Sequence, residues 1–354
     1  METTNKNILV APLNWGLGHA TRCIPIIREL EKNGFTVIIA SDGGALHMLQ
    51  KEFPHLQSLE LPSYDIEYAQ NEDDFKWKLI KNSPKMISAI FTEKKVVKKW
   101  LAEFDIQGII SDNRLGVHNK KVPSVIITHQ LNVLSGDTTW ISSKLHQHFI
   151  KKFTECWVPD IEEKPNLTGK LGHLKNKRLD VKYIGPLSRL EKKELKVIYD
   201  LMIVLSGPEP QRTILEQKLR KEIRNFKGKI VFVKGLVESE QKKEKSRNVI
   251  YYNYMTSKEL ERIFNKSKMV LCRSGYTTVM DLAKLKKKAF FIPTPGQFEQ
   301  EYLAKKLKQD GFVPYATQDD FVIENLLEVE LYTGLPQLRK DINWPELLML
   351  FERE

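Results

Sequence analysis

The chain alternates between short apolar runs rich in β-branched residues and longer stretches with apolar residues at helical spacing. This alternation predicts α/β domains, and the near-continuous hydrophobicity of the short runs predicts parallel strands covered on both faces. The strands predicted in the first half are Ile8–Leu13, Val37–Ser41, Gly108–Asp112, Val125–Thr128 and Val181–Gly185. Those in the second half are Leu201–Leu205, Ile230–Val233, Val249–Tyr252, Met269–Cys272 and Ala289–Pro293.

Helices are predicted between the later strands, and a polar break separates the two strand series. The predicted helices are Gln211–Arg224, Ser257–Asn265, Thr277–Lys284, Glu299–Gln309 and a last amphipathic one at Trp344–Phe351. The break is Gly185-Pro186 followed by a charged stretch, which is typical of a linker. We therefore expect doubly wound domains at residues 1–188 and 189–335, with a helix in 336–354 packing back on the first. Because ligands of such sheets bind beyond the carboxyl ends of strands, we expect a cleft between the two domains.

Composition narrows the function classes. The 354 residues suit two domains, and 41% hydrophobic with 29% charged residues indicates a globular chain. No segment reaches the ~18 apolar residues of a membrane span, and the polar start METTNKN does not resemble a signal peptide. The three cysteines are widely spaced, which favours free buried thiols in the cytoplasm. The net charge of +11 favours an anionic partner: nucleotide phosphates, an acidic lipid surface or nucleic acid.

A first glycine loop follows the first predicted strand and contains Gly16, Gly18, His19 and Arg22. Since a proline is tolerated in the first turn of a helix, Pro25 predicts a helix start near Thr21. His19 would then lie in the turn, at a helix terminus that favours anions.

Three interpretations of this loop stay open. It can be a dinucleotide fingerprint with Asp42 as the ribose acid, although Thr21 replaces the third glycine and Trp15 crowds the turn. It can be a tight turn whose histidine only caps or packs. It can also be a catalytic loop in which His19 is the general base, because histidine titrates near working pH.

A second strand, glycine turn and helix follow at Val270–Ala283. The turn places Ser274, Gly275, Tyr276 and Thr277 at a helix amino terminus, with N–H groups and hydroxyls predicted to point outward and bind two phosphates without a metal. Asp281, in the second helical turn, can take both hydroxyls of a ribose or can simply compensate the helix dipole.

Two further loops offer polar groups to a hydroxyl-rich ligand. The next strand leads through a Pro/Gly loop to Gln297, Gln300 and Glu301, which can hydrogen-bond a sugar or form a solvated helix start. The turn at Ser206 and Gly207 closes the first strand of the second half and allows a close approach of a ligand.

From Tyr251 to about Tyr315 the sequence resembles the donor-binding domain of glycosyltransferases related to the undecaprenyl-pyrophosphoryl-muramoyl N-acetylglucosaminyltransferase. The run Cys272-Arg273-Ser274-Gly275, with Asp281, Pro293 and Gln300-Glu301 at their intervals, carries the resemblance. It implies a GT-B fold, in which two Rossmann-like domains bind a nucleotide sugar. It also implies that the serine-glycine turn holds the pyrophosphate, Asp281 the ribose, Gln300 and Glu301 the sugar, and the backbone near Tyr252 and Asn253 the uracil.

The first glycine loop, Gly16-Leu17-Gly18-His19, resembles the acceptor-side loop of the same family, whose histidine is a candidate base. The family has more glycines where this chain has Asn14, Trp15 and Leu17, and Glu301 replaces a second family glutamine. The donor sugar and the acceptor are therefore left open.

These residues predict a direct displacement at the anomeric carbon of a UDP-sugar, inverting by resemblance. His19 would take a proton from the acceptor hydroxyl, and residues 274–277 would stabilise the diphosphate, with Arg273 or Lys234 adding charge. Asp112 is a second candidate base or orients His19, or else only caps the next turn. The chain has no D-x-D pair, so no metal and no cofactor is expected.

Two other functions stay open. A UDP-sugar hydrolase of pseudaminic acid synthesis has a G-x-G-H-x-x-R loop, which Gly16, Gly18, His19 and Arg22 reproduce; His19 would then activate water. A non-catalytic nucleotide-sugar binding protein is the second alternative.

The stretch Phe75–Phe104 is basic and amphipathic, with eight lysines and two glutamates. Such a segment lies on anionic membranes, which would suit a lipid-linked acceptor and a protein peripheral to the inner face of the membrane. The alternative is a core helix with a solvated lysine face. Nucleic acid is not an expected partner, because no stacking motif accompanies the lysines.

Overall fold

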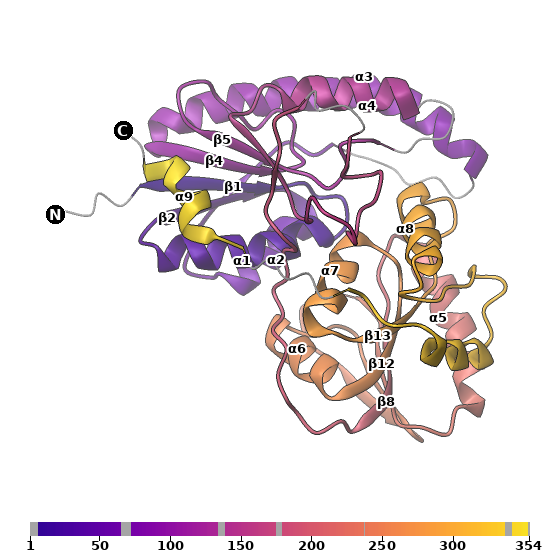
Figure 1. The fold of residues 1–354 in the computed structure, drawn as a ribbon. Helices are drawn as coiled ribbons and strands as arrows, with labels where there is room; N and C mark the ends of the chain where they lie inside the picture. The colour runs from indigo at the N-terminus through magenta and orange to yellow at the C-terminus, as the bar shows by residue number, and fades with distance from the viewer. Residues whose placement is uncertain are drawn as a thin grey trace. The chain divides into compact units, whose positions relative to one another are not determined.

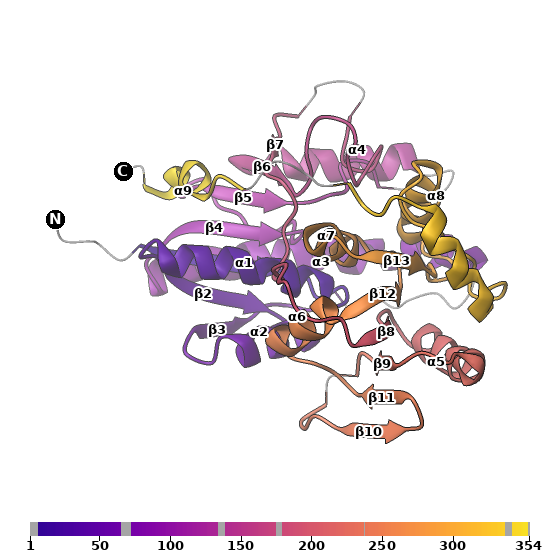
Figure 2. The same ribbon diagram turned by 60° about the horizontal axis from the view of Figure 1, so that its bottom comes forward.

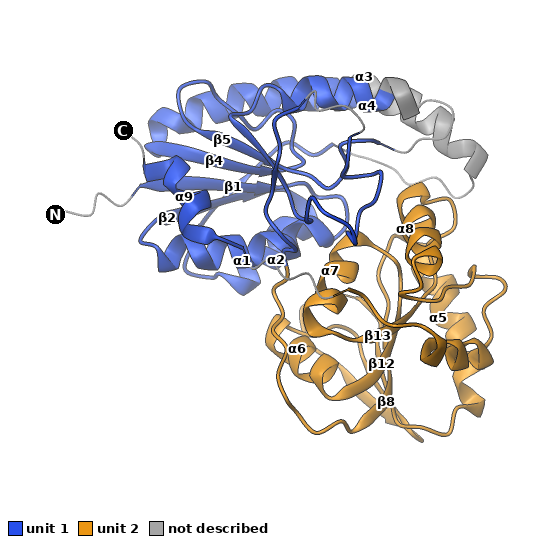
Figure 3. Cartoon of the chain, in the orientation of Figure 1, with its two compact units in different colours: residues 1–67, 76–187, 339–354 blue, residues 68–75, 188–338 orange. Residues whose placement is uncertain are grey.

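The computed structural model describes residues 6–64, 72–133, 139–174, 179–236, 238–336 and 342–352, without the side chains of 72–84 and 139–141. The chain divides into two compact units (Figure 3). Unit 1 comprises residues 1–67, 76–187 and 339–354, and unit 2 comprises residues 68–75 and 188–338.

Unit 1 is built on a seven-stranded sheet of order β3-β2-β1-β4-β5-β6-β7, in which every neighbouring pair is parallel. The strands are β1 (Asn7–Pro12), β2 (Thr36–Ser41), β3 (Gln57–Glu60), β4 (Ile106–Asp112), β5 (Ser124–Ile127), β6 (Glu155–Val158) and β7 (Lys182–Tyr183). The helices are α1 (Gly18–Lys32), α2 (Gly43–Glu52), α3 (Glu72–Glu103), α4 (Thr139–Ile150) and α9 (Trp344–Glu352).

Helices cover both faces of this sheet (Figures 1 and 2). On one face, Val97 of α3 packs with Leu9 and Ile109, while Ile150 of α4 packs with Ile126. The opposite face is covered by α1, α2 and α9. There a side chain at Gly108 would collide with the ring of Phe351, so this glycine lets α9 lie close to β4.

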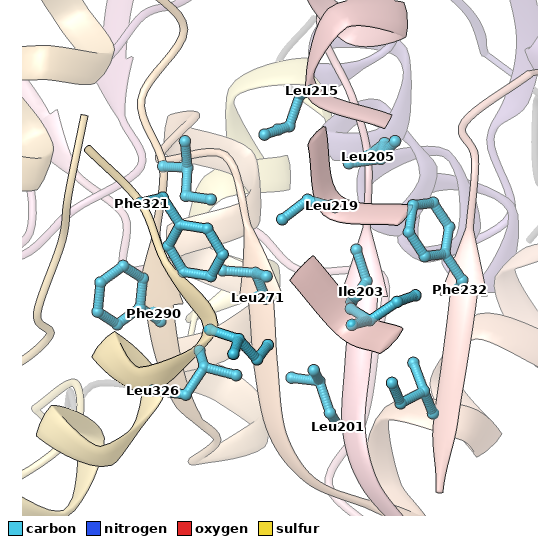
Figure 4. Close-up of a cluster of buried hydrophobic side chains, with 14 of the residues drawn as sticks. Leu201, Ile203, Leu205, Leu215, Leu219, Phe232, Leu271, Phe290, Phe321 and Leu326 are labelled. Atoms are coloured by element: carbon cyan, nitrogen blue, oxygen red, sulfur yellow. The ribbon is translucent and has the colours of Figure 1, made fainter. Parts of the chain in front are cut away.

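Unit 2 is built on a six-stranded sheet of order β10-β11-β9-β8-β12-β13, parallel except for the β10–β11 pair. The strands are β8 (Tyr199–Val204), β9 (Ile230–Val233), β10 (Lys243–Ser246), β11 (Val249–Tyr252), β12 (Ser267–Cys272) and β13 (Lys288–Phe291). The helices are α5 (Gln211–Glu222), η1 (Ile223–Asn225), α6 (Ser257–Asn265), α7 (Tyr276–Leu285), α8 (Phe298–Gln309) and η2 (Ile323–Leu331). Figure 4 shows the apolar core between this sheet and the elements α5 and η2, where Leu215 and Leu219 of α5 and Phe321 beside η2 pack with strand residues such as Ile203 and Leu271.

The predicted α/β class and both parallel-dominated sheets are confirmed, and each predicted strand has a counterpart. Three strands were not predicted, and Val181–Gly185 shortens to the two residues of β7. The edge strands β3 (QSLE) and β10 (KEKS) carry polar sequences, and β10 is exposed throughout. Edge strands need no apolar face on both sides, so hydrophobic runs do not reveal them.

The predicted start of the first helix, near Thr21, is wrong. The helix α1 begins at Gly18, and Pro25 lies inside it. One internal proline removes a single backbone hydrogen bond, whereas the first turn gains side-chain bonds from His19 and Arg22 to Asp112. His19 is therefore held on the first turn of the helix and not in the preceding loop.

Both sheets reverse their strand order at one point. In unit 1 the order changes between β1 and β4, and in unit 2 between β8 and β12. Ligands of open α/β sheets bind beyond the carboxyl ends of the strands at such points. The first glycine loop and Asp112 follow β1 and β4, while the Ser206 and Ser274 turns follow β8 and β12.

Candidate functional site

The site in unit 1 is centred on Asp112, at the carboxyl end of β4. Its carboxylate is completely buried, and its Oδ1 lies 2.7 Å from Nδ1 of His19. Arg22, one helical turn after His19, donates from Nε and one terminal nitrogen to the two oxygens of the same carboxylate. Residues three apart on a helix share a face, which brings both side chains to Asp112. The structure thus joins three of the predicted residues: His19, Asp112 and Arg22.

The contacts of His19 fix its protonation pattern. A carboxylate only accepts hydrogen bonds, so the 2.7 Å contact requires a proton on Nδ1. A terminal nitrogen of Arg22 also lies 3.0 Å from Nδ1, but the shorter contact with the carboxylate takes the Nδ1 proton. The neutral imidazole then has its lone pair on Nε2, which is the arrangement of a general base. The side chain keeps 12% of its surface exposed, whereas Asp112 has none.

Burial and charge set the pKa values in this cluster. Burial lowers the pKa of His19; Asp112 opposes this effect and the Arg22 charge adds to it. Burial alone would raise the pKa of Asp112, but Arg22 and His19 outweigh it and hold the value at about 2. At neutral pH, Asp112 is therefore ionised and His19 is unprotonated at Nε2.

His129 and His146 were not predicted, and both adjoin this cluster. His129 follows β5 and its Nδ1 lies 2.8 Å from a terminal nitrogen of Arg22. Because a guanidinium cannot accept, Nδ1 of His129 accepts and its proton is on Nε2. His146 of α4 is near it, and burial lowers the pKa of His146 to about 4. Neither histidine belongs to a local motif, so only the fold could reveal them.

A second buried network supports the glycine loop. The sequence did not predict that its residues interact. Arg114, fully buried, pairs with Asp42 and, at 2.6 Å, with Glu93 of α3. Asn14 of the loop donates to Asp42 at 3.1 Å and accepts from the N–H of Ala45 in α2 at 3.1 Å. Asp42 is therefore engaged in holding the loop, which argues against the dinucleotide interpretation that gave it a ribose.

The loop glycines occupy the conformations that the turn requires. Gly16 has φ +73°, a backbone region that glycine adopts at no cost, and it is exposed. Gly18 is the first residue of α1, and its carbonyl accepts from the hydroxyl of Thr21 at 2.9 Å. The loop thus delivers the chain directly into the helix that carries His19.

In unit 2, the predicted phosphate-binding turn lies at the start of α7. The Ser274 hydroxyl, however, does not point outward as predicted. Gly275 is the residue before the helix, and Gly275 and Thr277 are partly exposed. Ser274 is buried and donates to the carbonyl of Gln300 at 2.7 Å, so its hydroxyl does not point outward. The ring of Tyr276 is buried as well. The first N–H groups of α7 and the partly exposed Thr277 lie at this turn.

Arg273 is turned into the protein, which differs from its predicted role of adding charge at a leaving group. It donates to the carbonyls of Ile292 and Pro293 at 3.2 and 3.0 Å. It also donates to the carbonyl of Gln211 at 3.0 Å and to Gln318 at 2.7 Å. Burial lowers its pKa to about 10. Arg273 therefore fastens together the loops that follow β12 and β13 and the start of α5.

The loop after β13 is stabilised by the residues predicted to contact the sugar. Gln300 accepts from the N–H of Thr294 at 2.9 Å and donates to Gln297. Glu301 accepts from the N–H of Gly296 at 3.0 Å. These side chains shape the loop in this structure, and their predicted contact with a sugar stays a prediction.

Asp281 faces the segment before β8. It is buried, and its Oδ1 accepts from the hydroxyl of Ser188 at 2.6 Å. Burial raises its pKa to about 6, although the Arg189 charge and the Ser188 bond act in the other direction. The predicted contact with a ribose is untested, and any such ligand would compete with Ser188.

The remaining predicted donor residues lie around the ends of β8, β9 and β11. Ser206 and Gly207 are exposed, and Gly207 adopts φ +99°. Lys234 lies 4.0 Å from a carboxylate oxygen of Glu216. Tyr252 is buried with Lys243 over its ring, and Asn253 bonds to the backbone of Lys242 at 2.8 Å.

Within the described residues, no group of three or more His, Cys, Asp or Glu side chains could hold a metal ion. The three cysteines are buried and form no disulfide.

Comparisons with known proteins agree with this arrangement of two sheets. Residues 208–338 match the glycosyltransferase family 28 C-terminal domain. Over 334 residues the chain is 22% identical to the UDP-N-acetylglucosamine--N-acetylmuramyl-(pentapeptide) pyrophosphoryl-undecaprenol N-acetylglucosamine transferase of Haemophilus ducreyi, covering 92% of this chain and 89% of that relative.

Two solved structures show the same fold. MurG of Acinetobacter baumannii superposes with a TM-score of 0.56 at 13% identity, covering 99% of this chain and 100% of that one. The glycotransferase of kitacinnamycin superposes with a TM-score of 0.63 at 13% identity, covering 98% and 93%. The chain is therefore a glycosyltransferase of the GT-B fold, and its residues 208–338 carry the family 28 C-terminal domain.

Proposed function

We propose that this glycosyltransferase moves a sugar from a UDP-sugar to a hydroxyl group of a lipid-linked acceptor, with inversion and without a required metal or cofactor. The observation that carries the proposal is the His19–Asp112 pair, in which a buried carboxylate leaves Nε2 of a partly exposed histidine ready to accept a proton. The name of the Haemophilus ducreyi relative supports the donor class and the acceptor class.

The transfer would proceed in one displacement. Nε2 of His19 takes the proton of the acceptor hydroxyl while that oxygen bonds to the anomeric carbon, and the bond from this carbon to the UDP oxygen breaks. Asp112 stabilises the imidazolium that forms and keeps the ring oriented. The electron pair and the negative charge leave with UDP.

The donor would be held by unit 2. The amino terminus of α7 lies at Gly275 and Thr277, and the positive end of the helix dipole there suits the two phosphates of UDP. Exposed Ser206 and Gly207 follow the neighbouring strand β8 at the reversal point of the sheet.

The lipid-linked acceptor would bring the protein to an anionic membrane surface on its cytoplasmic side. No helix of the described residues is long and apolar enough to cross a membrane. The side chains of Ile87 and Phe91 on α3 are 44% and 62% exposed, and Lys94, Lys95 and Lys98 are exposed near them. Apolar side chains among lysines suit binding at a lipid headgroup layer.

The hydrolase alternative would use the same His19–Asp112 pair on water. The relative and the structures compared above are transferases, which gives that alternative no support. Nucleic acid is not a partner in this proposal.

The test is UDP release from a panel of UDP-sugars, with and without a membrane-lipid extract. We expect release that depends on the extract and falls at least about 100-fold in His19→Ala, as expected for a general base. His55→Ala is the matched control, since His55 is exposed and pairs with Glu31 on the surface. Release that is equally fast without an acceptor would establish the hydrolase instead, and no UDP binding at all would refute the donor class.

A further inference from the structure

Arg22 forms an ion pair with the residue that orients the proposed base. Its guanidinium is 1% exposed and bonds both oxygens of Asp112, while the remaining terminal nitrogen reaches His129 at 2.8 Å. All three nitrogens are thus directed at the cluster around His19. A fork of this kind fixes both the position and the plane of a carboxylate.

The charge of Arg22 also determines what Asp112 does to His19. A lone buried carboxylate beside an imidazole favours the protonated, cationic form. Such a histidine would be a poor base, because Nε2 would carry a proton at neutral pH. With Arg22 bound to it, Asp112 belongs to a pair with no net charge, so it can hold the Nδ1 proton of His19 without attracting a second one.

We propose that Arg22 is a positioning residue that keeps His19 neutral, by neutralising Asp112 and fixing the carboxylate that accepts the Nδ1 proton. This inference rests on the proposed function, in which His19 is the base. It adds a role for the arginine that follows the glycine-histidine loop by three residues.

Few other titratable groups in the described part of the chain face this pair. Cys23 of α1 has its sulfur 3.8 Å from Asp112, and burial followed by the Asp112 charge raises the pKa of this thiol well above its ordinary value. His129, after β5, accepts from Arg22 at Nδ1, and the buried His146 of α4 lies near His129. Burial lowers the pKa of His19 most, Asp112 raises it, and Arg22 and a charge on His129 lower it.

The experiment is a pH titration of the His19 ring nitrogens by NMR in the ligand-free full chain, with the signal assigned by His19→Gln. The variants are Arg22→Gln, which loses the charge but can still donate a hydrogen bond, and Arg22→Lys, which keeps the charge. Arg28→Gln is the matched control on the same helix, because Arg28 is exposed and pairs with Glu52.

We expect Arg22→Gln to raise the pKa of His19 by about one unit or more, as removal of a neighbouring charge does. The acidic limb of the kcat/KM profile should shift to higher pH by the same amount. At pH values on this limb, kcat/KM should therefore be about tenfold lower than in wild type. In Arg22→Lys the pKa of His19 should stay close to its wild-type value. Arg28→Gln should leave this pKa unchanged.

A His19 pKa that is the same in Arg22→Gln and wild type would overturn the proposal. If Arg22→Gln does not fold, Arg22→Lys decides: an upward shift there, despite the retained charge, refutes charge compensation. The titration needs no substrate. A shifted His19 in a protein without transferase activity would therefore leave this inference standing and would remove only the proposed function.

Discussion

The hydroxyl of Ser188 donates to the carboxylate of Asp281 at 2.6 Å and so ties the segment before β8 to helix α7. The two residues are 93 positions apart in the sequence, and Asp281 is buried. A buried carboxylate with one hydroxyl and a nearby arginine is incompletely compensated, which is why its pKa rises to about 6.

We predict that Asp281 makes the protein less stable as pH rises from about 4 to about 7. The pKa of Asp281 is about 6 in the folded chain, above the ordinary value of 3.8. Between these values the folded state binds the proton and the unfolded state does not, so the free energy of unfolding falls as pH increases. Urea unfolding should show that, across this pH range, the free energy of unfolding of wild type falls by on the order of 1–3 kcal/mol more than that of Asp281→Asn.

Ser188→Ala is the control for this prediction, because it keeps the carboxylate and removes a bond that favours its ionised form. Its pH dependence should be at least as steep as that of wild type. A wild-type slope that persists unchanged in Asp281→Asn would assign the effect to another group.

We predict that Arg273→Met loosens the loops around the donor site. The substitution leaves the carbonyls of Ile292, Pro293 and Gln211 without their donor. Each buried acceptor that loses its partner lowers the free energy of unfolding by about 1–3 kcal/mol. Chemical unfolding should therefore show a loss of several kcal/mol, and UDP binding measured by calorimetry should weaken.

The comparison for Arg273→Met is Arg262→Met, at an exposed position of α6 in the same unit. That variant should keep both stability and UDP affinity. Full stability in Arg273→Met with a loss confined to UDP binding would instead mean that this arginine acts on the phosphates, as the sequence suggested.

We predict that Thr294→Val stabilises the ligand-free protein. Thr294 is 1% exposed, and its hydroxyl has no hydrogen-bond partner among the residues that the structure describes. Burying an unpaired hydroxyl costs about 1–3 kcal/mol, and valine has nearly the same shape. Thermal unfolding should show a higher Tm for Thr294→Val and no gain for Thr294→Ser, which keeps the hydroxyl. A lower Tm for the valine variant would show that the hydroxyl has a partner, such as an ordered water.

The sequence predicts the strands of both sheets well because a buried parallel strand needs a continuous apolar run, as in Ile8–Val10. It also identifies His19 and Asp112, since His19 comes after the first such strand and Asp112 is the last residue of another. It cannot show that Arg22 and Asp112, which are 90 positions apart, form a fork. A lone arginine on a helix is usually at the surface, and only the strand order brings it to a buried carboxylate.

Two side chains do not point as the sequence predicts, and the physical cause is the same for both. Ser274 and Arg273 are polar residues beside a glycine turn, a setting in which sequence reasoning directs side chains toward a ligand. In the structure each bonds to a backbone carbonyl of a neighbouring segment. Buried backbone groups in tight loops require partners, and the polar side chains nearest to them provide these bonds.

We predict that Phe91→Glu weakens binding to anionic lipid vesicles. In α3 the apolar positions divide between two faces: Ile90 and Val97 are buried, whereas Ile87 and Phe91 are exposed. Transfer of an aromatic side chain into the headgroup layer contributes about 1.5–3 kcal/mol, and the glutamate adds repulsion from the anionic surface. Vesicle co-sedimentation should therefore show an affinity loss of about tenfold or more.

Leu331→Glu is the matched control for the membrane prediction, because Leu331 is 83% exposed in η2 of unit 2, outside the lysine-bearing helix α3. This variant adds the same negative charge without altering α3, so it should leave vesicle binding unchanged. Equal losses in Phe91→Glu and Leu331→Glu would indicate a general effect of added negative charge. An unchanged affinity in Phe91→Glu would mean that α3 does not contact the lipid, and the acceptor would then have to be delivered to the protein by another surface.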